Sequence, residues 1–330
     1  MSDLSTQYMG LTLRNPIVVS SCDLTKSVSG IRKCADAGAG AVVLKSIFEE
    51  QFLIKGDIPE EGYSIHPEAL DYLRSGGLME YAPQKVCQLI TEAKKEVDIP
   101  LIASINCQTS KLWPSFAKQI YDAGADALEL NIYLLPIDLD VPGSDYENTH
   151  IEILRKVKKE VPIPVSVKLV SQITSIPYFA RRLADEGADA LVLFNWFLEP
   201  DIDVNSRKTR NIKGKGNFFQ SLRWVALLAD RLSCDIASSG GIKNADDIIK
   251  QILAGASVVQ ACSVFYERGL DEINLLLEGI RDWMKDKRFD SIDGFRGHLS
   301  FHQQKLSFKD LGEAEKYFRA QYLKTYSKFG

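Results

Sequence analysis

The chain has 330 residues, of which 45% are hydrophobic and 25% are charged, proportions typical of a water-soluble globular protein. A formal net charge of −4 offers no basic footprint for nucleic acid, and no apolar run approaches the roughly 20 residues that cross a membrane. The N-terminal residues lack the basic and then apolar pattern of a signal peptide, which predicts a cytoplasmic protein.

Cysteine and histidine usage predicts neither a metal site nor a disulfide framework. The six cysteines are scattered and form no C-x-x-C pair. His298 and His302 are four residues apart, but no acidic ligand pattern accompanies them, so we expect surface or packing roles. Cys22 and Cys262 stay open to a function because both fall at the ends of predicted strands.

One short phrase recurs four times along the chain and indicates the fold. Each copy reads as the end of a helix, a glycine that stops it and a short apolar strand. The glycines are 86, 63 and 68 residues apart, about the length of two βα units each. The copies lie at residues 36–45, 122–131, 185–195 and 253–262, with the glycines at Gly38, Gly124, Gly187 and Gly255.

Further apolar runs alternate with these copies and lack the polar alternation of a half-exposed strand, as expected for a parallel sheet covered on both faces. These runs are residues 16–21, 100–106, 164–169 and 235–239. Amphipathic stretches predict helices at residues 113–123, 147–160, 176–186, 246–254 and 270–286. Eight strands in four double units predict a closed (β/α)8 barrel, the TIM barrel, as a single domain over residues 1–330.

Three segments are too long for simple connections, at residues 46–81, 132–148 and 196–219. All follow strands on the same side, which predicts enlarged loops at the C-terminal face, where this fold builds its active sites. The third segment is glycine-rich and basic, so it is either a lid for an anionic ligand or a solvated mobile loop. Its basic residues are Arg207, Lys208, Arg210, Lys213 and Lys215.

Polar residues stand where the predicted strands end. They are costly to desolvate, so either a bound polar ligand or a self-satisfied network must supply their partners. These residues are Ser20, Ser21, Lys45, Asn106, Asn131, Lys168, Asn195, Ser239, Gly240, Gly241, Cys262 and Ser263.

Two features of this set indicate the ligand. Gly240 and Gly241 open the segment before a predicted helix, where backbone N–H groups can approach a phosphate. Lys168 is either a Schiff-base lysine of an aldolase or a cation beside a flavin ring. The three asparagines favour the flavin, because amides both donate to and accept from a planar ring with imide edges.

Over nearly its whole length the sequence resembles the dihydroorotate dehydrogenase family, and its tail resembles the class 1 branch. The matching motifs include Glu129-Leu-Asn131, Val165-Ser-Val-Lys-Leu169, Ser239-Gly-Gly-Ile242 and Ser291-Ile-Asp-Gly-Phe-Arg-Gly297. The resemblance implies FMN as cofactor, with its phosphate on Gly240, Gly241, Cys262 and Ser263. It implies that Ser20, Ser21, Lys45, Asn131, Lys168 and Asn195 line the flavin, and that Asn131 and Asn195 also face the substrate.

The sequence departs from the family where the substrate is expected. In the family a Cys or Ser after the fourth strand removes a proton from dihydroorotate, but here that position is Leu134, which cannot accept one. Tyr133 is the neighbouring candidate acid or base, or else packs over the barrel mouth. A family asparagine is replaced by Ile137, and the second asparagine loop by residues 74–80, which begin with Arg74. Arg74 and the basic loop hint at an anionic substrate.

The leading hypothesis is therefore an FMN-dependent oxidoreductase of pyrimidine-biosynthesis type, acting on CH–CH groups, whose substrate has changed or whose base has moved. Lys45, Lys168 and Tyr133 are its candidate catalytic residues. The alternatives are a flavin-binding barrel without dihydroorotate turnover and a lysine aldolase. No cysteine cluster for an iron–sulfur centre is present in the sequence, so such a centre would need a partner subunit. The class 1 resemblance implies a homodimer.

Overall fold

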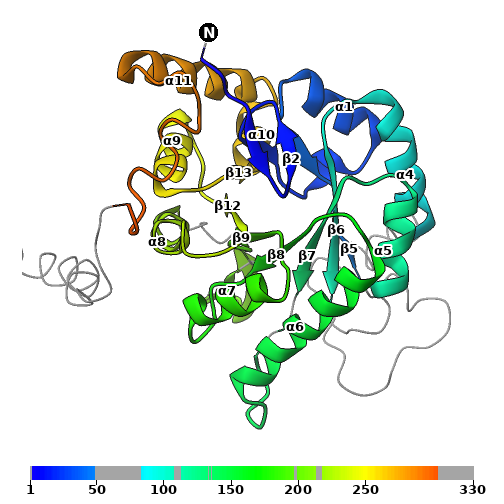
Figure 1. Ribbon diagram of the computed structural model, residues 1–330. Helices are drawn as coiled ribbons and strands as arrows, with labels where there is room; N and C mark the ends of the chain where they lie inside the picture. Colours follow the sequence, from blue (N-terminus) through cyan, green and yellow to red (C-terminus); the bar gives the residue numbers. More distant parts are fainter. Residues whose placement is uncertain are drawn as a thin grey trace, which may run out of the picture.

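The computed structural model describes residues 2–48, 83–107, 113–132, 134, 136–196, 199–212 and 218–303. In these ranges eight parallel strands close into a barrel in the order β4-β3-β13-β12-β9-β8-β7-β6, and β4 pairs with β6 to complete the ring (Figure 1). The predicted (β/α)8 barrel is confirmed. Its strands are β3 (Ile17–Val19), β4 (Ala41–Val43), β6 (Leu101–Cys107), β7 (Ala127–Ile132), β8 (Val165–Leu169), β9 (Ala190–Leu193), β12 (Asp235–Ser239) and β13 (Val258–Ala261).

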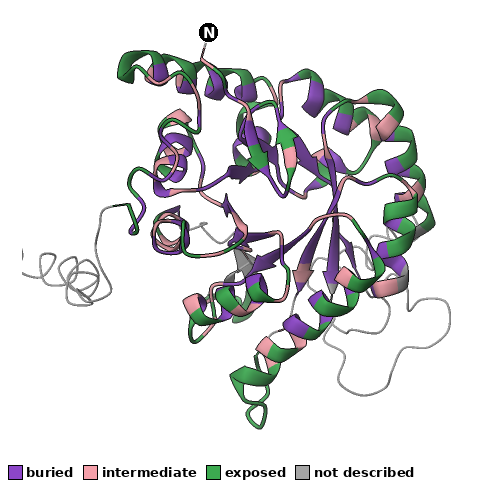
Figure 2. Ribbon diagram, viewed as in Figure 1, coloured by how far each residue is buried: buried purple, intermediate pink, exposed green. Residues whose placement is uncertain are grey.

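Helices surround the barrel, and Figure 2 shows buried residues on their inner sides and exposed residues on their outer sides. The five helices expected from amphipathic stretches are present, with ends shifted by at most four residues. The helices are α1 (Val28–Asp36), α4 (Pro83–Glu96), α5 (Trp113–Asp122), α6 (Gly143–Glu160), α7 (Ile176–Asp185), α8 (Phe218–Leu228), α9 (Ala245–Ala254), α10 (Ser263–Arg268) and α11 (Glu272–Lys287).

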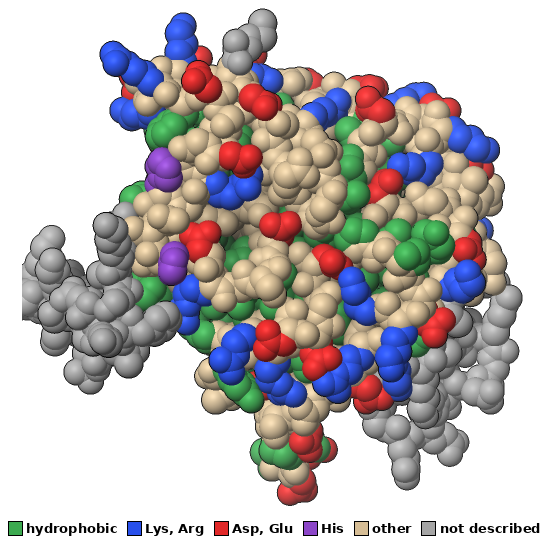
Figure 3. Space-filling view, in the orientation of Figure 1, with side chains coloured by type: hydrophobic (Ala, Val, Ile, Leu, Met, Phe, Trp, Pro, Cys, Tyr) green, Lys and Arg blue, Asp and Glu red, His purple; other side chains and the backbone are tan. Residues whose placement is uncertain are grey.

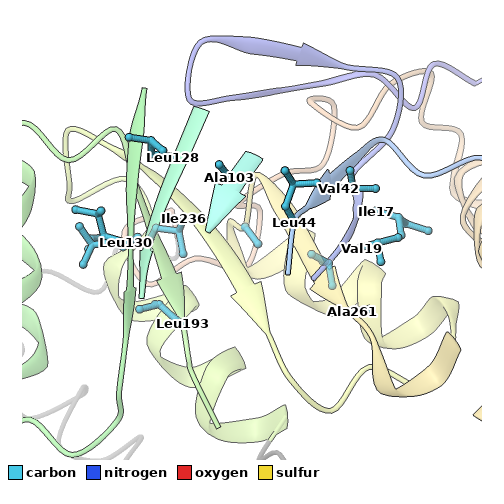
Figure 4. Close-up of a cluster of buried hydrophobic side chains, with 14 of the residues drawn as sticks. Ile17, Val19, Val42, Leu44, Ala103, Leu128, Leu130, Leu193, Ile236 and Ala261 are labelled. Carbon is cyan, nitrogen blue, oxygen red and sulfur yellow. The ribbon is translucent and has the colours of Figure 1, made fainter. Parts of the chain in front are cut away.

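The strands are apolar on both faces because two separate hydrophobic layers cover them. Ile17 and Val19 of β3 belong to the larger cluster, between the strands and the helices, part of which Figure 4 shows. Val18, between them, belongs to a smaller cluster that gathers residues from strands all round the ring, and therefore lies inside the barrel. Successive side chains of a strand point to opposite faces, which explains the alternation. This is the physical reason that the sequence runs lack polar alternation.

A hairpin closes the N-terminal end of the barrel. Strands β1 (Thr6–Tyr8) and β2 (Leu11–Leu13) pair antiparallel, and Tyr8, Met9 and Leu13 pack into the interior cluster. Met9 and Gly10 both have positive φ angles, 54° and 73°, as a two-residue type I′ turn requires. The backbone N–H of Met9 donates to Oδ2 of Asp235 at 2.7 Å, which fixes the hairpin to β12. The barrel therefore has a closed apolar base, and its polar residues lie at the other end.

The predicted long loops have different outcomes. Within the predicted enlarged loop 196–219, residues 199–212 form an antiparallel hairpin, β10 (Glu199–Asp203) and β11 (Lys208–Ile212), which the sequence did not predict. Asp203 makes this turn, because its side chain accepts hydrogen bonds from the N–H groups of Asn205 and Ser206. Within the predicted loop 132–148, α6 begins earlier, at Gly143.

Other predictions fall on parts of the chain that the structure does not describe. Nearly all of loop 46–81 and its residue Arg74, together with Lys213 and Lys215, lie outside the described residues. Residues 304–330 do so as well, so a single domain over 1–330 stays a prediction.

The described surface carries charges of both signs. On the face seen in Figure 3, basic and acidic side chains lie intermingled over the helices. None of the described helices combines the length and the apolar character that crossing a membrane demands.

Candidate active site

Polar side chains fill the barrel above its apolar base. Ser104, Glu129, Ser166 and Gln260 are buried to 1% exposure or less, although they come from four different strands. The strand register places Ser104 beside Glu129, and Glu129 beside Ser166. One step nearer the carboxyl ends, the same register places Asn106, Asn131 and Lys168 side by side. The strand-end residues predicted from the sequence therefore meet at one end of the barrel.

Lys168 is the centre of a buried network that joins four strands. Its ammonium Nζ lies 3.4 Å from Oγ of Ser20, 3.4 Å from Oε1 of Gln260 and 3.7 Å from Oε1 of Glu129. Nε2 of Gln260 in turn donates to Oε2 of Glu129 at 2.5 Å. The Glu129 carboxylate neutralises the lysine in the interior, as a buried charge requires. The three contacts of Nζ are longer than strong hydrogen bonds, so the ammonium retains capacity to donate to a ligand.

Two asparagines form an amide pair at the mouth. Nδ2 of Asn195 donates to Oδ1 of Asn131 at 2.8 Å. Oδ1 of Asn195 accepts from the backbone N–H of Trp196 at 3.1 Å, which fixes the orientation of the Asn195 amide. Both asparagines are half-buried, so the hydrogen-bonded pair is still partly accessible. The structure brings together these two residues, which are 64 positions apart in the sequence.

Lys45 and Ser21 lie on the opposite side of the ring from this pair. The Lys45 ammonium is 3.5 Å from Oδ1 of Asp23, and its side chain is only 12% exposed. Oγ of Ser21 is 3.0 Å from Oγ of Ser46, which is 2.8 Å from Oγ of Ser104. These three hydroxyls form a hydrogen-bonded chain from the mouth to the buried layer that holds Glu129.

The predicted phosphate region has a more specific packing than the sequence indicated. Gly240 and Gly241 have φ angles of 95° and 76°. A Cβ added at Gly240 would lie 2.0 Å from Nε1 of Trp196, so the indole itself requires glycine there. The Trp196 indole N–H donates to the carbonyl of Ser239 at 3.2 Å. Phosphate binding by Gly240, Gly241, Cys262 and Ser263 stays a prediction, and so does cofactor binding by Ser239.

The two cysteines left open by the sequence are neighbours. A hydrogen bond with the Cys262 thiol, together with burial, raises the pKa of the Cys22 thiol well above its ordinary value. Cys22 is therefore a neutral thiol near pH 7 and a poor nucleophile. Over the described residues, no group of His, Cys, Asp and Glu side chains is arranged to hold a metal ion.

At the position of the family's base, this chain has the apolar residue Leu134. Leu134 is half-buried and packs against the larger hydrophobic cluster. Ile137, where the family has an asparagine, is 71% exposed. Tyr133 lies outside the described residues, so its acid or base role stays a prediction. The described part of this segment supplies no proton acceptor at position 134.

Sequence reasoning missed two members of the site, Glu129 and Gln260. Both carry a usable signal, because each lies two positions before a predicted site residue in the same predicted strand, where alternate side chains share a face. Trp196 was missed as well, and its contacts with Gly240 and Ser239 reveal it.

Comparison with known proteins identifies the family of this chain. A family model described as dihydroorotate dehydrogenase matches residues 3–284. The catalytic subunit of dihydroorotate dehydrogenase B (NAD(+)) from Thermoplasma volcanium is 29% identical over 310 residues, which cover 90% of this chain and 98% of the relative. The protein of the same name from Methanocaldococcus jannaschii is 27% identical over 299 residues, 86% and 94% of the two chains. This chain belongs to the dihydroorotate dehydrogenase family.

Proposed function

We propose that this protein is an FMN-dependent oxidoreductase that desaturates a CH–CH bond in a small planar substrate, with dihydroorotate, the substrate of pyrimidine biosynthesis, as its first candidate. The observation that carries this proposal is the buried Lys168 network beneath the Asn131–Asn195 amide pair, at the carboxyl ends of a barrel of this family. The names of the relatives support the reaction class.

The donor set fits a flavin mononucleotide. A cation with spare donor capacity and an oriented amide pair suit a ring whose edge alternates carbonyl and N–H groups. Bound FMN supplies the acceptor for a hydride. Ser20, Ser21, Lys45, Asn131, Lys168 and Asn195 would hold its ring, and Ser239, Gly240, Gly241, Cys262 and Ser263 its phosphate.

Desaturation removes a hydride from one carbon and a proton from its neighbour, so the chain must also provide a proton acceptor. Leu134 cannot serve, and its packing against the core leaves no polar atom there. Loss of a positioned base costs on the order of 10²–10⁴ in rate. We therefore propose that dihydroorotate itself is turned over slowly. Either the physiological substrate is a different, anionic compound, or another residue such as Tyr133 removes the proton.

The assembly is also part of the proposal. The relatives are named catalytic subunits, which supports association with a second subunit. We propose a homodimeric core in the cytoplasm that receives this partner, with the electron acceptor on the partner's side. Light scattering of the purified chain tests the dimer, and a monomer at micromolar concentration would contradict it.

The deciding experiment is an anaerobic absorption spectrum of the protein after reconstitution with FMN, followed by addition of dihydroorotate. Flavin bands in the spectrum support the cofactor, and their bleaching supports dihydroorotate as substrate. Bands that persist after dihydroorotate is added support FMN as cofactor and favour a changed substrate. If no candidate substrate reduces the bound flavin, the flavin-binding barrel without turnover is favoured. A protein that takes up no FMN contradicts the proposal, and borohydride trapping of a carbonyl compound on Lys168 would then favour the aldolase.

A further inference from the structure

Asn106, at the end of β6, has a side chain that the fold leaves unused. It is fully buried, at 0% exposure. Neither its Nδ2 nor its Oδ1 has a hydrogen-bond partner within the part of the chain that the structure describes. Buried polar groups in native proteins are nearly always hydrogen-bonded, so each exception needs an explanation. The explanation here must account for a donor and an acceptor on the same planar group.

The strand geometry shows where this amide points. Ile105, its neighbour on β6, packs in the layer under the helices, so Asn106 faces the interior of the barrel. Ser104, two residues earlier and on the same face, contacts Ser46 inside the ring. Asn106 is paired in register with Asn131 on β7, which is paired with Lys168 on β8. Asn106 therefore extends the row of site residues by one strand.

Its neighbours in this row are engaged, which distinguishes Asn106 from them. Asn131 accepts a hydrogen bond from Asn195, and Lys168 contacts Ser20, Gln260 and Glu129. An amide with both functions unused, beside two residues proposed to hold a ring, is complementary to a ring edge that offers an N–H next to a carbonyl.

We propose that Asn106 is a ligand-binding residue that recognises the amide or imide edge of a planar ring, with Oδ1 accepting from the ring N–H and Nδ2 donating to the adjacent ring carbonyl. The proposal rests on the proposed function and deepens it, because the ring is either the flavin or the substrate. Both rings carry the same chemistry at such an edge, and the experiment separates them.

The test replaces Asn106 by leucine, which is similar in size and makes no hydrogen bonds. The matched control is Gln251→Leu: Gln251 on α9 is also fully buried, and both its amide atoms also lack partners among the described residues. For each variant, the melting temperature of the FMN-free protein is measured, followed by the Kd for FMN from flavin fluorescence. The Kd for orotate follows from its perturbation of the bound flavin spectrum.

We expect the FMN-free Asn106→Leu protein to melt at or above the wild-type temperature, because an unsatisfied amide has been removed. One of the two Kd values should rise on the order of 10- to 100-fold, the effect of two lost hydrogen bonds. A rise in the FMN Kd assigns the edge to the flavin, and a rise in the orotate Kd alone assigns it to the substrate. Gln251→Leu should change neither.

Two results would overturn the inference. One is a pair of unchanged Kd values in Asn106→Leu, and the other is a lower melting temperature of the FMN-free protein, which would assign the amide a structural role. Asn106→Ser, which is smaller, repeats the test if the leucine does not fold. If the wild type takes up no FMN, the proposed function fails separately. The test then measures how far orotate shifts the melting temperature of the FMN-free wild type. A shift that is lost in Asn106→Leu supports the inference, and absence of any shift overturns it.

Discussion

In the buried ion pair at the centre of the barrel, the energetic effect of replacing one residue depends on its burial. Lys168 and Glu129 are both nearly inaccessible, with side chains 8% and 1% exposed. Replacement of one partner leaves the other charge buried without compensation, which is far more costly than the loss of an exposed pair. The pair is therefore expected to dominate the stability of the barrel interior.

Lys168→Met should lower the free energy of unfolding of the FMN-free protein by about 3–5 kcal/mol. The double variant Lys168→Met, Glu129→Gln should recover part of this loss, because no charge is left in the barrel. Arg32→Met, which breaks the exposed pair with Glu96 at 3.4 Å, is the control and should cost less than about 1 kcal/mol. Urea unfolding measures all three, and equal losses for Lys168→Met and Arg32→Met would contradict the role of burial.

Leu134 allows the missing base to be tested directly. Leu134→Ser places a hydroxyl at the position of the family's base and should speed reduction of the bound flavin by dihydroorotate on the order of 10²-fold. Leu134→Ala removes the same apolar contact without adding a proton acceptor and should not. Stopped-flow absorbance under anaerobic conditions measures the rates. Equal rates in the two variants would show that another residue already removes the proton.

At the scale of elements, helix α6 is held against α7 through a buried histidine. Nδ1 of His150 donates to the carbonyl of Tyr146 at 2.7 Å, and its ring meets that of Phe179 edge to face at 5.4 Å. Nε2 has no partner among the described residues. Burial lowers the pKa of His150 to about 4, only partly offset by the hydrogen bond to Tyr146.

This shift makes the α6–α7 contact sensitive to acid. The folded protein holds His150 neutral, whereas the unfolded chain binds a proton below about pH 6.5. The contribution of His150 to the free energy of unfolding is therefore complete above pH 6.5. It is lost as the pH falls from 6.5 through 4, by about 3 kcal/mol in total. His150→Met should flatten the dependence of unfolding free energy on pH in this window, while exposed His302→Gln should not. Parallel curves for His150→Met and the wild type would refute the assignment.

The same scale shows what sequence reasoning could and could not predict. The glycines of the repeated phrase that end the helices, such as Gly38 and Gly255, have positive φ angles, 97° and 116°, so the repeat located helix ends and strands correctly. Such signals are local. Hairpin 199–212 was not predicted, because its strands lack an apolar alternation and its turn depends on one aspartate side chain.

The site was predictable only in part for a related reason. The end of each strand identifies residues such as Lys168 and Asn131, because closure of the barrel brings all strand ends together. The alternation of side chains along one strand predicts which residues face the barrel interior. It does not reveal which residue of another strand each of them contacts. Gln260 and Glu129 are 131 positions apart, and their hydrogen bond follows from the strand order of the closed ring.

At the scale of the whole molecule, the segment after α11 joins distant parts of the barrel. Asp3 and Ser291 form a parallel bridge, and the N–H groups of Gly297 and Phe301 donate to carbonyls of Ile252 and Ala226. Phe295 anchors this segment. It is fully buried and packs on the ring of Trp283 at 4.9 Å between centroids.

Phe295→Ala should lower the free energy of unfolding by about 3–5 kcal/mol, because it opens a cavity where three parts of the chain meet. Phe219→Ala is the control, since Phe219 is 70% exposed and its loss should change stability by about 0.5 kcal/mol or less. Guanidinium unfolding measures both. A small effect of Phe295→Ala would mean that residues 290–303 contribute little to the stability of the barrel.

The hairpin that closes the base of the barrel also constrains how the chain is made. Met9 is bound by Asp235, Thr6 donates to the carbonyl of Ser257, and Arg296 donates to the Thr6 hydroxyl. A ribosome releases Thr6 and Met9 well before their partners, which follow 226 to 290 positions later. Until residues as far as Arg296 have been synthesised, the β1–β2 hairpin has no complete barrel base to close, and its apolar side chains stay available to other chains or to a chaperone.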